Sequence, residues 1–118
     1  EIFHVLDGKI LSDSRAYYDW HRLNPAGFTY FENYTDYLTA DIGEYLLDET
    51  RVFIDAYSAS FPKEDRARIM EYIMASKLYA RAIADIPALR LKLKVMSDAI
   101  RQTFDTEGWE QVYWERFF

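Results

Sequence analysis

The chain has 118 residues, of which 50% are hydrophobic and 18% aromatic, and it contains 4 glycines, 3 prolines and no cysteine. This length and composition predict one folded domain and exclude a disordered segment. Without cysteine, the chain has no disulfides, no thiolate metal ligands and no cysteine nucleophile. The formal net charge is −6, from eleven acids against four bases in residues 1–60 (−7) and nine acids against ten bases in residues 61–118 (+1).

This charge distribution argues against a nucleic-acid partner. Two explanations stay open for it: the two halves pair internally, or the acidic half faces a basic partner surface. No apolar run approaches the length of about 20 residues that a membrane helix needs, and no signal sequence opens the chain. We therefore expect no membrane association and a cytoplasmic location. The chain begins with Glu1 rather than Met, as a single helical domain excised from a longer polypeptide would.

The first predicted elements lie between Ile2 and Pro25. In residues 2–11, Asp7 and Gly8 separate two short apolar runs, a pattern compatible with a small hairpin or with a helix and turn. A helix capped by Ser12 or Asp13 is predicted next, because apolar residues recur three and four apart until Asn24-Pro25 ends the pattern. These apolar residues are Ala16, Tyr17, Trp20 and Leu23.

A long helix is predicted to follow, starting at Thr29 or Thr35 and ending at Tyr57. Thr29 and Glu32 have the spacing of a capping box, and no proline interrupts the segment. One helical stripe is formed by Phe31, Leu38, Ile42, Leu46, Phe53 and Tyr57. A second apolar line through Ala40, Leu47 and Ile54 places this helix near the centre of the fold.

A second long helix is predicted from Pro62 to Ile86, since proline is tolerated in a first turn and Pro87 ends the pattern. Within it, Ser76, Ala80 and Ala84 permit close approach by another helix of this chain or of a second subunit. Residues 89–104 fit a further helix better than a strand, and Thr106 can cap a last helix ending near Phe117. The predicted fold is all-α, with about five helices and two long central antiparallel helices in a bundle.

The candidate binding surface is a set of phenols and carboxylates that the first long helix would carry on one side. It comprises Tyr34, Tyr37, Asp41, Glu44, Tyr45 and Asp48. Tyrosine gives a large contact area with a polar tip, so this surface suits a protein partner or a small cationic ligand. The alternative is that the tyrosine side chains pack at the edge of the core, while the acids are solvated or paired with basic residues of the next helix.

Asp19, His21 and Arg22 form a second, weaker candidate, because an imidazole near a carboxylate and a guanidinium suits acid–base chemistry. Adjacent residues of a helix point apart, so these three would not make a site by themselves. With two histidines, the sequence carries no metal-binding motif, and we expect no metal or other cofactor. The basic run of Arg90, Lys92 and Lys94 predicts a solvated face rather than a phosphate site.

The segment from Tyr30 to Leu38 resembles the part of TetR-type repressors that follows the recognition helix. The resemblance covers nine of the 118 residues. Tyr34 stands where that family usually has a basic residue, and residues 1–27 lack its helix-turn-helix signature. We therefore expect no DNA-binding domain.

The surplus of aromatics and the lack of a catalytic motif favour a non-catalytic helical module that binds a protein partner or itself. One alternative is a helical accessory domain of a larger enzyme, such as a transferase. Another is a domain that senses a small ligand in an aromatic-lined cavity. An enzyme acting through Asp19, His21 and Glu32 is the last hypothesis.

Overall fold

The computed structural model describes residues 2–118, and this part of the chain is entirely helical, with no strand. Its α-helices are α1 (Ile2–Asp13), α2 (Pro62–Ala75), α3 (Lys77–Ala84) and α4 (Pro87–Thr103). The short 3-10 segments are Trp20–Leu23, Tyr34–Leu38, Gly43–Leu46, Tyr57–Ala59 and Tyr113–Phe117. The predicted fold class is therefore confirmed.

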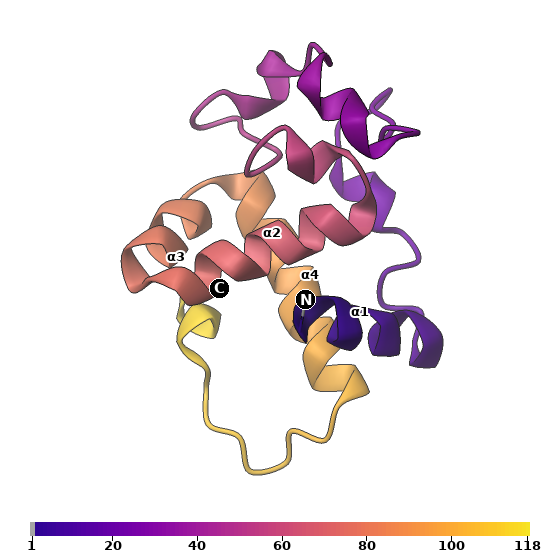
Figure 1. Ribbon diagram of the computed structural model, residues 1–118. Helices are drawn as coiled ribbons and strands as arrows, with labels where there is room; N and C mark the ends of the chain where they lie inside the picture. Colours follow the sequence, from indigo (N-terminus) through magenta and orange to yellow (C-terminus); the bar gives the residue numbers. More distant parts are fainter. Residues whose placement is uncertain (1) are drawn as a thin grey trace.

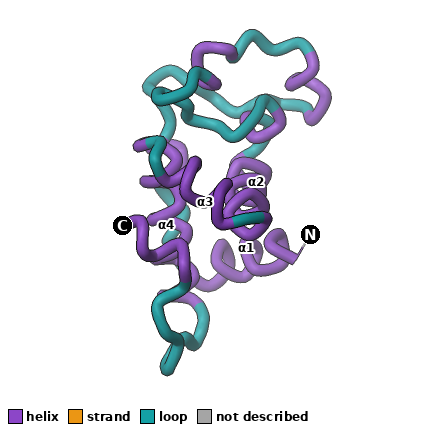
Figure 2. Tube along the Cα trace, turned by 90° about the vertical axis from the view of Figure 1, so that its left-hand side faces the viewer, coloured by secondary structure: helices purple, strands orange, loops and turns teal. Residues whose placement is uncertain are grey.

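Helices α1, α2 and α4 contact one another, and α3 packs against α2 and α4 (Figure 1). Their shared core is built mainly from aliphatic side chains that are almost completely buried. It includes Ile10, Ile69, Ile73, Leu89, Leu93 and Met96. The irregular segment between α1 and α2 forms a layer over one end of these helices (Figure 2). A smaller aromatic core around Phe28, Tyr45 and Phe53 holds that layer together.

Residues 2–13 form a helix, which decides between the hairpin and the helix left open by the sequence. The helix predicted for residues 12–23 is replaced by a turn and a 3-10 segment. The Ser14 hydroxyl donates to the Ile10 carbonyl at 2.9 Å and accepts from the Ala16 N–H at 3.2 Å. These local bonds satisfy backbone groups that a continuing helix would have paired, so α1 ends at Asp13.

The long helix predicted between Thr29 and Tyr57 is absent, and only short 3-10 turns occur there. The segment is rich in Asp and Thr, whose side chains compete for backbone hydrogen bonds. Asp36 accepts from the Asn33 N–H at 3.1 Å, and Asp55 accepts from the Ser58 N–H at 3.0 Å. Of the predicted stripe, Phe31, Ile42, Leu46 and Phe53 pack in the smaller core, whereas Leu38 is 67% exposed.

The second long helix is broken at Ser76, between α2 and α3. Among residues 2–118 the longest helix is therefore α4, with 17 residues, and the predicted pair of long central antiparallel helices is not found. Helix α4 itself was predicted within two residues at each end. The helix predicted after Thr106 is reduced to the 3-10 segment Tyr113–Phe117, because the chain turns at Gly108 with a φ of 83°.

The C-terminal segment returns to α4 and is held there by polar contacts. Arg101 donates to Glu115 at 2.6 Å, and the Trp114 indole donates to the Ser97 hydroxyl at 3.2 Å. None of the helices in residues 2–118 combines the length and the apolar composition that crossing a membrane requires.

Candidate functional site

A groove of about 610 Å³ lies between α1 and the outer face of α2. We call it the α1–α2 groove. Its lining combines five apolar side chains with a cluster of polar ones. These residues are Ile2, Phe3, His4, Tyr57, Glu64, Ala67, Arg68, Met70, Glu71 and Met74. The volume falls within the range of about 300–1,000 Å³ that is usual for binding pockets.

The start of α2 fixes one side of this groove. Phe61 is extended and Pro62 occupies the first turn of α2. Backbone N–H groups in a first turn have no partner within the helix, so the N–H that proline lacks is not needed there. Glu64 therefore lies in the first turn, where the helix dipole favours a carboxylate. Arg68, Glu71 and Ala75 follow at intervals of three and four, so they share the same side of the helix.

The Glu64 carboxylate is the polar centre of the groove. One of its oxygens lies 3.1 Å from His4 Nε2, which joins α1 to α2 at this point. Burial and the neighbouring Glu64 carboxylate raise the pKa of the Tyr57 phenol. Glu64 thus lies between an imidazole and a phenol that come from different parts of the chain.

Arg68 forms the wall of the groove on the side away from α1. Its guanidinium lies over the Tyr57 ring at 5.0 Å, with a nitrogen 3.0 Å from Glu71 and another 3.4 Å from Asp55. Two acids therefore contact Arg68, and a third, Glu64, lines the same groove. Lys63 lies near Glu64 and Tyr57, so the three carboxylates and two cations carry a formal net charge of −1 with histidine counted as neutral.

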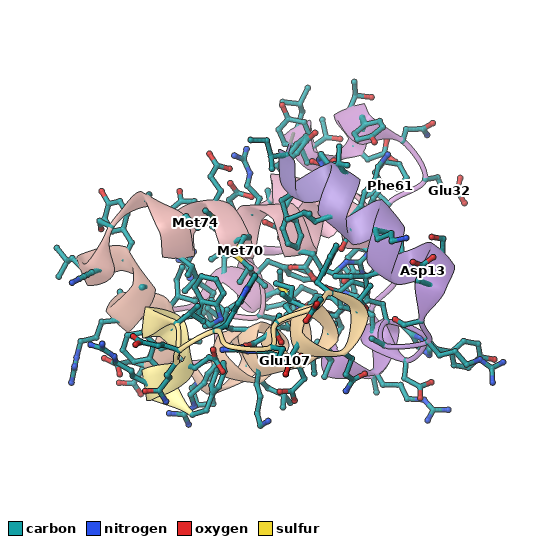
Figure 3. The ribbon with its side chains drawn as sticks, turned by 90° about the horizontal axis from the view of Figure 1, so that it is seen from below. Asp13, Glu32, Phe61, Met70, Met74 and Glu107 are labelled. Atoms are coloured by element: carbon teal, nitrogen blue, oxygen red, sulfur yellow. The ribbon has the colours of Figure 1, made fainter. Side chains whose placement is uncertain are left out.

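The apolar part of the groove is formed by Phe3 and Met70 inside and by Ile2 and Met74 at the rim. Met70 and Met74 lie one turn apart on α2 (Figure 3). Ile2 is 81% exposed and Met74 is 68% exposed, and Val5, on the next turn of α1, is also exposed. Helix α1 therefore buries one face in the core and leaves a second apolar face in water.

The second polar cluster is buried in the core and joins four parts of the chain. Lys92 Nζ donates to Asp65 at 2.8 Å and to the Val52 carbonyl at 2.8 Å. The Tyr30 hydroxyl donates to Asp65 at 2.7 Å and accepts from Trp20 and Asn24, each at 2.9 Å. Lys92 and Asp65 are both 0% exposed, so the expected solvated position of Lys92 is wrong.

Burial opposes charge on both partners of this pair. It raises the pKa of Asp65 against the pull of Lys92, and it lowers the pKa of Lys92 against the pull of Asp65. Because neither side chain reaches solvent, we assign the cluster a structural role. It fixes α2, α4 and the irregular layer in one arrangement.

A second buried ion pair attaches α1 to α2. Arg66 donates to both Asp7 oxygens, at 2.7 and 2.9 Å, and its guanidinium lies 4.2 Å from the Tyr17 ring centre. This two-point contact is the geometry in which arginine pairs are strongest. The pair holds both walls of the α1–α2 groove at a fixed distance.

The residues predicted as one binding surface do not share a helix face. Tyr34 and Tyr37 contact the Tyr57 ring, with ring centres 6.4 and 5.3 Å apart, so they lie next to the α1–α2 groove. Tyr45 packs against Phe53 in the smaller core. The remaining members, Asp41, Glu44 and Asp48, are exposed in the irregular layer.

The residues Asp19, His21 and Arg22 are all exposed. Arg22 Nε lies 3.6 Å from Asp19, a contact between neighbouring residues of one turn. His21 is not brought to the α1–α2 groove, whereas His4 is. Within residues 2–118, no three His, Asp or Glu side chains are placed to hold a metal ion.

Sequence reasoning missed the pairing of His4 with Glu64 and of Tyr57 with Arg68. These pairs are 60 and 11 positions apart, and no motif links them. Comparisons with protein-family models, with curated proteins and with solved structures gave no match for this chain. The chemistry of the groove therefore has to come from its own residues. They offer hydrogen-bonding groups of both charges beside an apolar floor, a combination that recognises an amphipathic partner.

Proposed function

We propose that this chain is a protein-interaction module that binds a segment of a partner protein in the α1–α2 groove. The observation that carries the proposal is the groove itself, where the buried Glu64 carboxylate and other polar groups lie beside large apolar side chains left in water. Exposed apolar groups that flank a concave surface are typical of interaction sites. The module is non-catalytic and regulatory or structural in role.

The methionines support this proposal. Met70 and Met74 have flexible, polarizable side chains that adapt to different partners, and such residues are common at protein-binding surfaces. Tyr57 and Arg68 belong to the residue types that are enriched at the energetic centres of interfaces. Their stacked arrangement is already formed without a partner, so little side-chain freedom would be lost on binding.

The test is a selection of short random peptides displayed on phage against the purified chain, followed by affinity measurements on the selected peptides. Met74→Glu places a charge at the apolar rim, and we expect it to weaken binding about tenfold or more. Leu47→Glu is the matched control, because Leu47 is 61% exposed and does not line the groove. It should bind as the wild type does.

The proposal is wrong if the selection yields no peptide that binds in solution. It is also wrong if the selected peptides bind the Met74→Glu variant as tightly as the wild type. Circular dichroism and urea denaturation of each variant separate lost binding from lost structure.

A second candidate is the sensing of a small apolar ligand, which a pocket of about 200 Å³ beside α3 favours. It is lined mainly by apolar and aromatic side chains, among them Ile54, Tyr72, Tyr79, Ile83 and Leu89. The pocket is smaller than the usual range of about 300–1,000 Å³. Binding of benzene or a similar probe, followed by the chemical shifts of Ile83 and Leu89, would support this function.

A further inference from the structure

We infer that the partner segment in the α1–α2 groove is basic, with an apolar side chain directed at Met70 and Met74 and a Lys or Arg beside Glu71 and Glu64. This inference rests on the proposed function and specifies the partner's chemistry. It commits to a segment of another protein rather than to a second copy of this chain.

The charge of the groove is the first argument. Glu64, Glu71 and Asp55 outnumber the two cations near them, Arg68 and Lys63, with His4 counted as neutral. Arg68 is already paired with two of these acids, and its guanidinium also lies over the Tyr57 ring. Glu71 keeps 62% of its side-chain surface in water, so a cation from a partner can reach it without displacing Arg68.

The length of the concave surface is the second argument. The Arg68–Glu71 pair also lines a smaller cavity of about 250 Å³, which continues around α2 to Tyr72 and Tyr79. The two cavities together are too long for one side chain and fit a segment of several residues. Glu71 lines both cavities, so it lies between the apolar part near Met74 and the aromatic part near Tyr79. A matching segment would therefore carry its positive charge between two apolar positions.

Electrostatics disfavour a second copy as the occupant. Every copy carries a net charge of −6, so two copies repel each other. Of the fourteen lysines and arginines, seven are paired with acids within the described part of the chain, among them Arg66 with Asp7, Lys92 with Asp65, Lys94 with Asp98 and Arg101 with Glu115. A basic segment of a different protein therefore complements the acids of the groove better than a second copy of this chain does.

The experiment uses the peptides from the selection described above, measured by fluorescence anisotropy with the complete chain. We expect the enriched peptides to be basic, with apolar residues on both sides of the charge. Replacing their Lys and Arg by Gln should weaken binding about tenfold, and the affinity should fall as salt is raised.

Glu71→Gln tests the contact on the side of this chain. It should weaken a basic peptide about two- to fivefold and leave the Gln-substituted peptide unchanged. Glu107→Gln is the matched control, because Glu107 is an exposed acid in the loop after α4, away from the groove (Figure 3). It should leave both peptides unaffected.

The outcomes distinguish this inference from the proposed function. Binding that depends on Met74 but involves neutral or acidic peptides overturns the basic partner and keeps the interaction module. Loss of Met74 dependence overturns both. A dimer seen by native mass spectrometry and abolished by Met74→Glu would place a second copy in the groove, which also overturns the inference.

Discussion

Lys92 shows how much the fold depends on single buried charges. It lies at the centre of the molecule, where Asp65 and the Val52 carbonyl satisfy its ammonium group and the Phe53 ring lies 4.2 Å away. Removing a charge from water costs several kcal/mol, which is recovered only when its partners are in place. The pair therefore adds little net stability but penalises any arrangement that separates α2 from α4.

We predict that Lys92→Met destabilises the fold by about 3–5 kcal/mol, because it leaves Asp65 buried without its cation. Urea denaturation followed by circular dichroism measures the change. Lys94→Met is the matched control two residues along the same helix. Lys94 is half exposed and paired only with Asp98, so its loss should cost less than about 1 kcal/mol. Equal effects of the two changes would contradict the assigned role of Lys92.

A double variant separates the loss of attraction between Lys92 and Asp65 from the cost of leaving the Asp65 carboxylate buried without a cation. Adding Asp65→Leu to Lys92→Met removes the uncompensated carboxylate, although Tyr30 then loses its acceptor. We expect the double variant to be more stable than Lys92→Met alone. A double variant that is less stable by the sum of both single changes would show that the two residues act independently.

At the scale of elements, Ser76 determines where α2 ends and α3 begins. Its hydroxyl accepts from the Tyr79 N–H at 3.0 Å, and its backbone is extended, with φ −163° and ψ 154°. This is the geometry of an N-cap residue, which satisfies one of the free donors at a helix start. The resulting change of direction places Tyr79 against Tyr72, with ring centres 5.9 Å apart, at the end of the concave surface.

We predict that Ser76→Ala destabilises the chain by about 1 kcal/mol, since alanine cannot cap α3. Thermal or urea denaturation is the measurement. Ser12→Ala is the control, because Ser12 is an exposed serine inside α1 whose hydroxyl caps no helix. Its effect should stay within about 0.5 kcal/mol. If Ser76→Ala were neutral, tertiary contacts rather than the cap would have to set the break.

The elements that could be predicted from sequence are those whose local signals agree. For α4, Pro87 ends the preceding pattern and a sustained apolar stripe follows it over residues 89–104, and the structure has a helix at Pro87–Thr103. Between Thr29 and Tyr57 the apolar stripe was also present. There, however, the Asp36 and Asp55 side chains accept hydrogen bonds from backbone N–H groups, and the chain folds back to bury apolar residues in the smaller core. Apolar periodicity alone does not reveal such competing hydrogen bonds between side chains and the backbone.

The candidate site was less predictable than the fold for a related reason. The tyrosines at 34 and 37 were recognised as a potential surface, and they do border the groove through Tyr57. The pairing of His4 with Glu64 depends on how α1 docks, which is a tertiary event. Asp7 and Arg66 fix that docking, and nothing in the spacing of 59 residues between them reveals a contact.

At the scale of the whole molecule, buried phenols couple stability to alkaline pH. Burial, with Asp7 nearby for Tyr17 and Asp65 for Tyr30, raises the pKa of both phenols well above the ordinary value of 10.0. In the unfolded chain both would ionise near that value. Above it the unfolded state binds fewer protons than the folded state, so the free energy of unfolding must fall as pH rises.

We predict that Tyr17→Phe removes part of this alkaline loss. The Tyr17 hydroxyl is buried without a hydrogen-bond partner among the described residues, so phenylalanine should also be neutral or slightly stabilising at pH 7. The Arg66 guanidinium keeps an aromatic ring to lie against. Urea denaturation between pH 7 and about 11 measures the effect, and each buried phenol contributes a slope of at most about 1.4 kcal/mol per pH unit.

Tyr18→Phe, which changes a neighbouring exposed tyrosine, should follow the wild-type curve. A Tyr17→Phe variant with the wild-type slope would show that the core around Arg66 and Asp7 opens before the phenol ionises. The α1–α2 groove would then lose one wall at high pH while α2 and α4 stay packed.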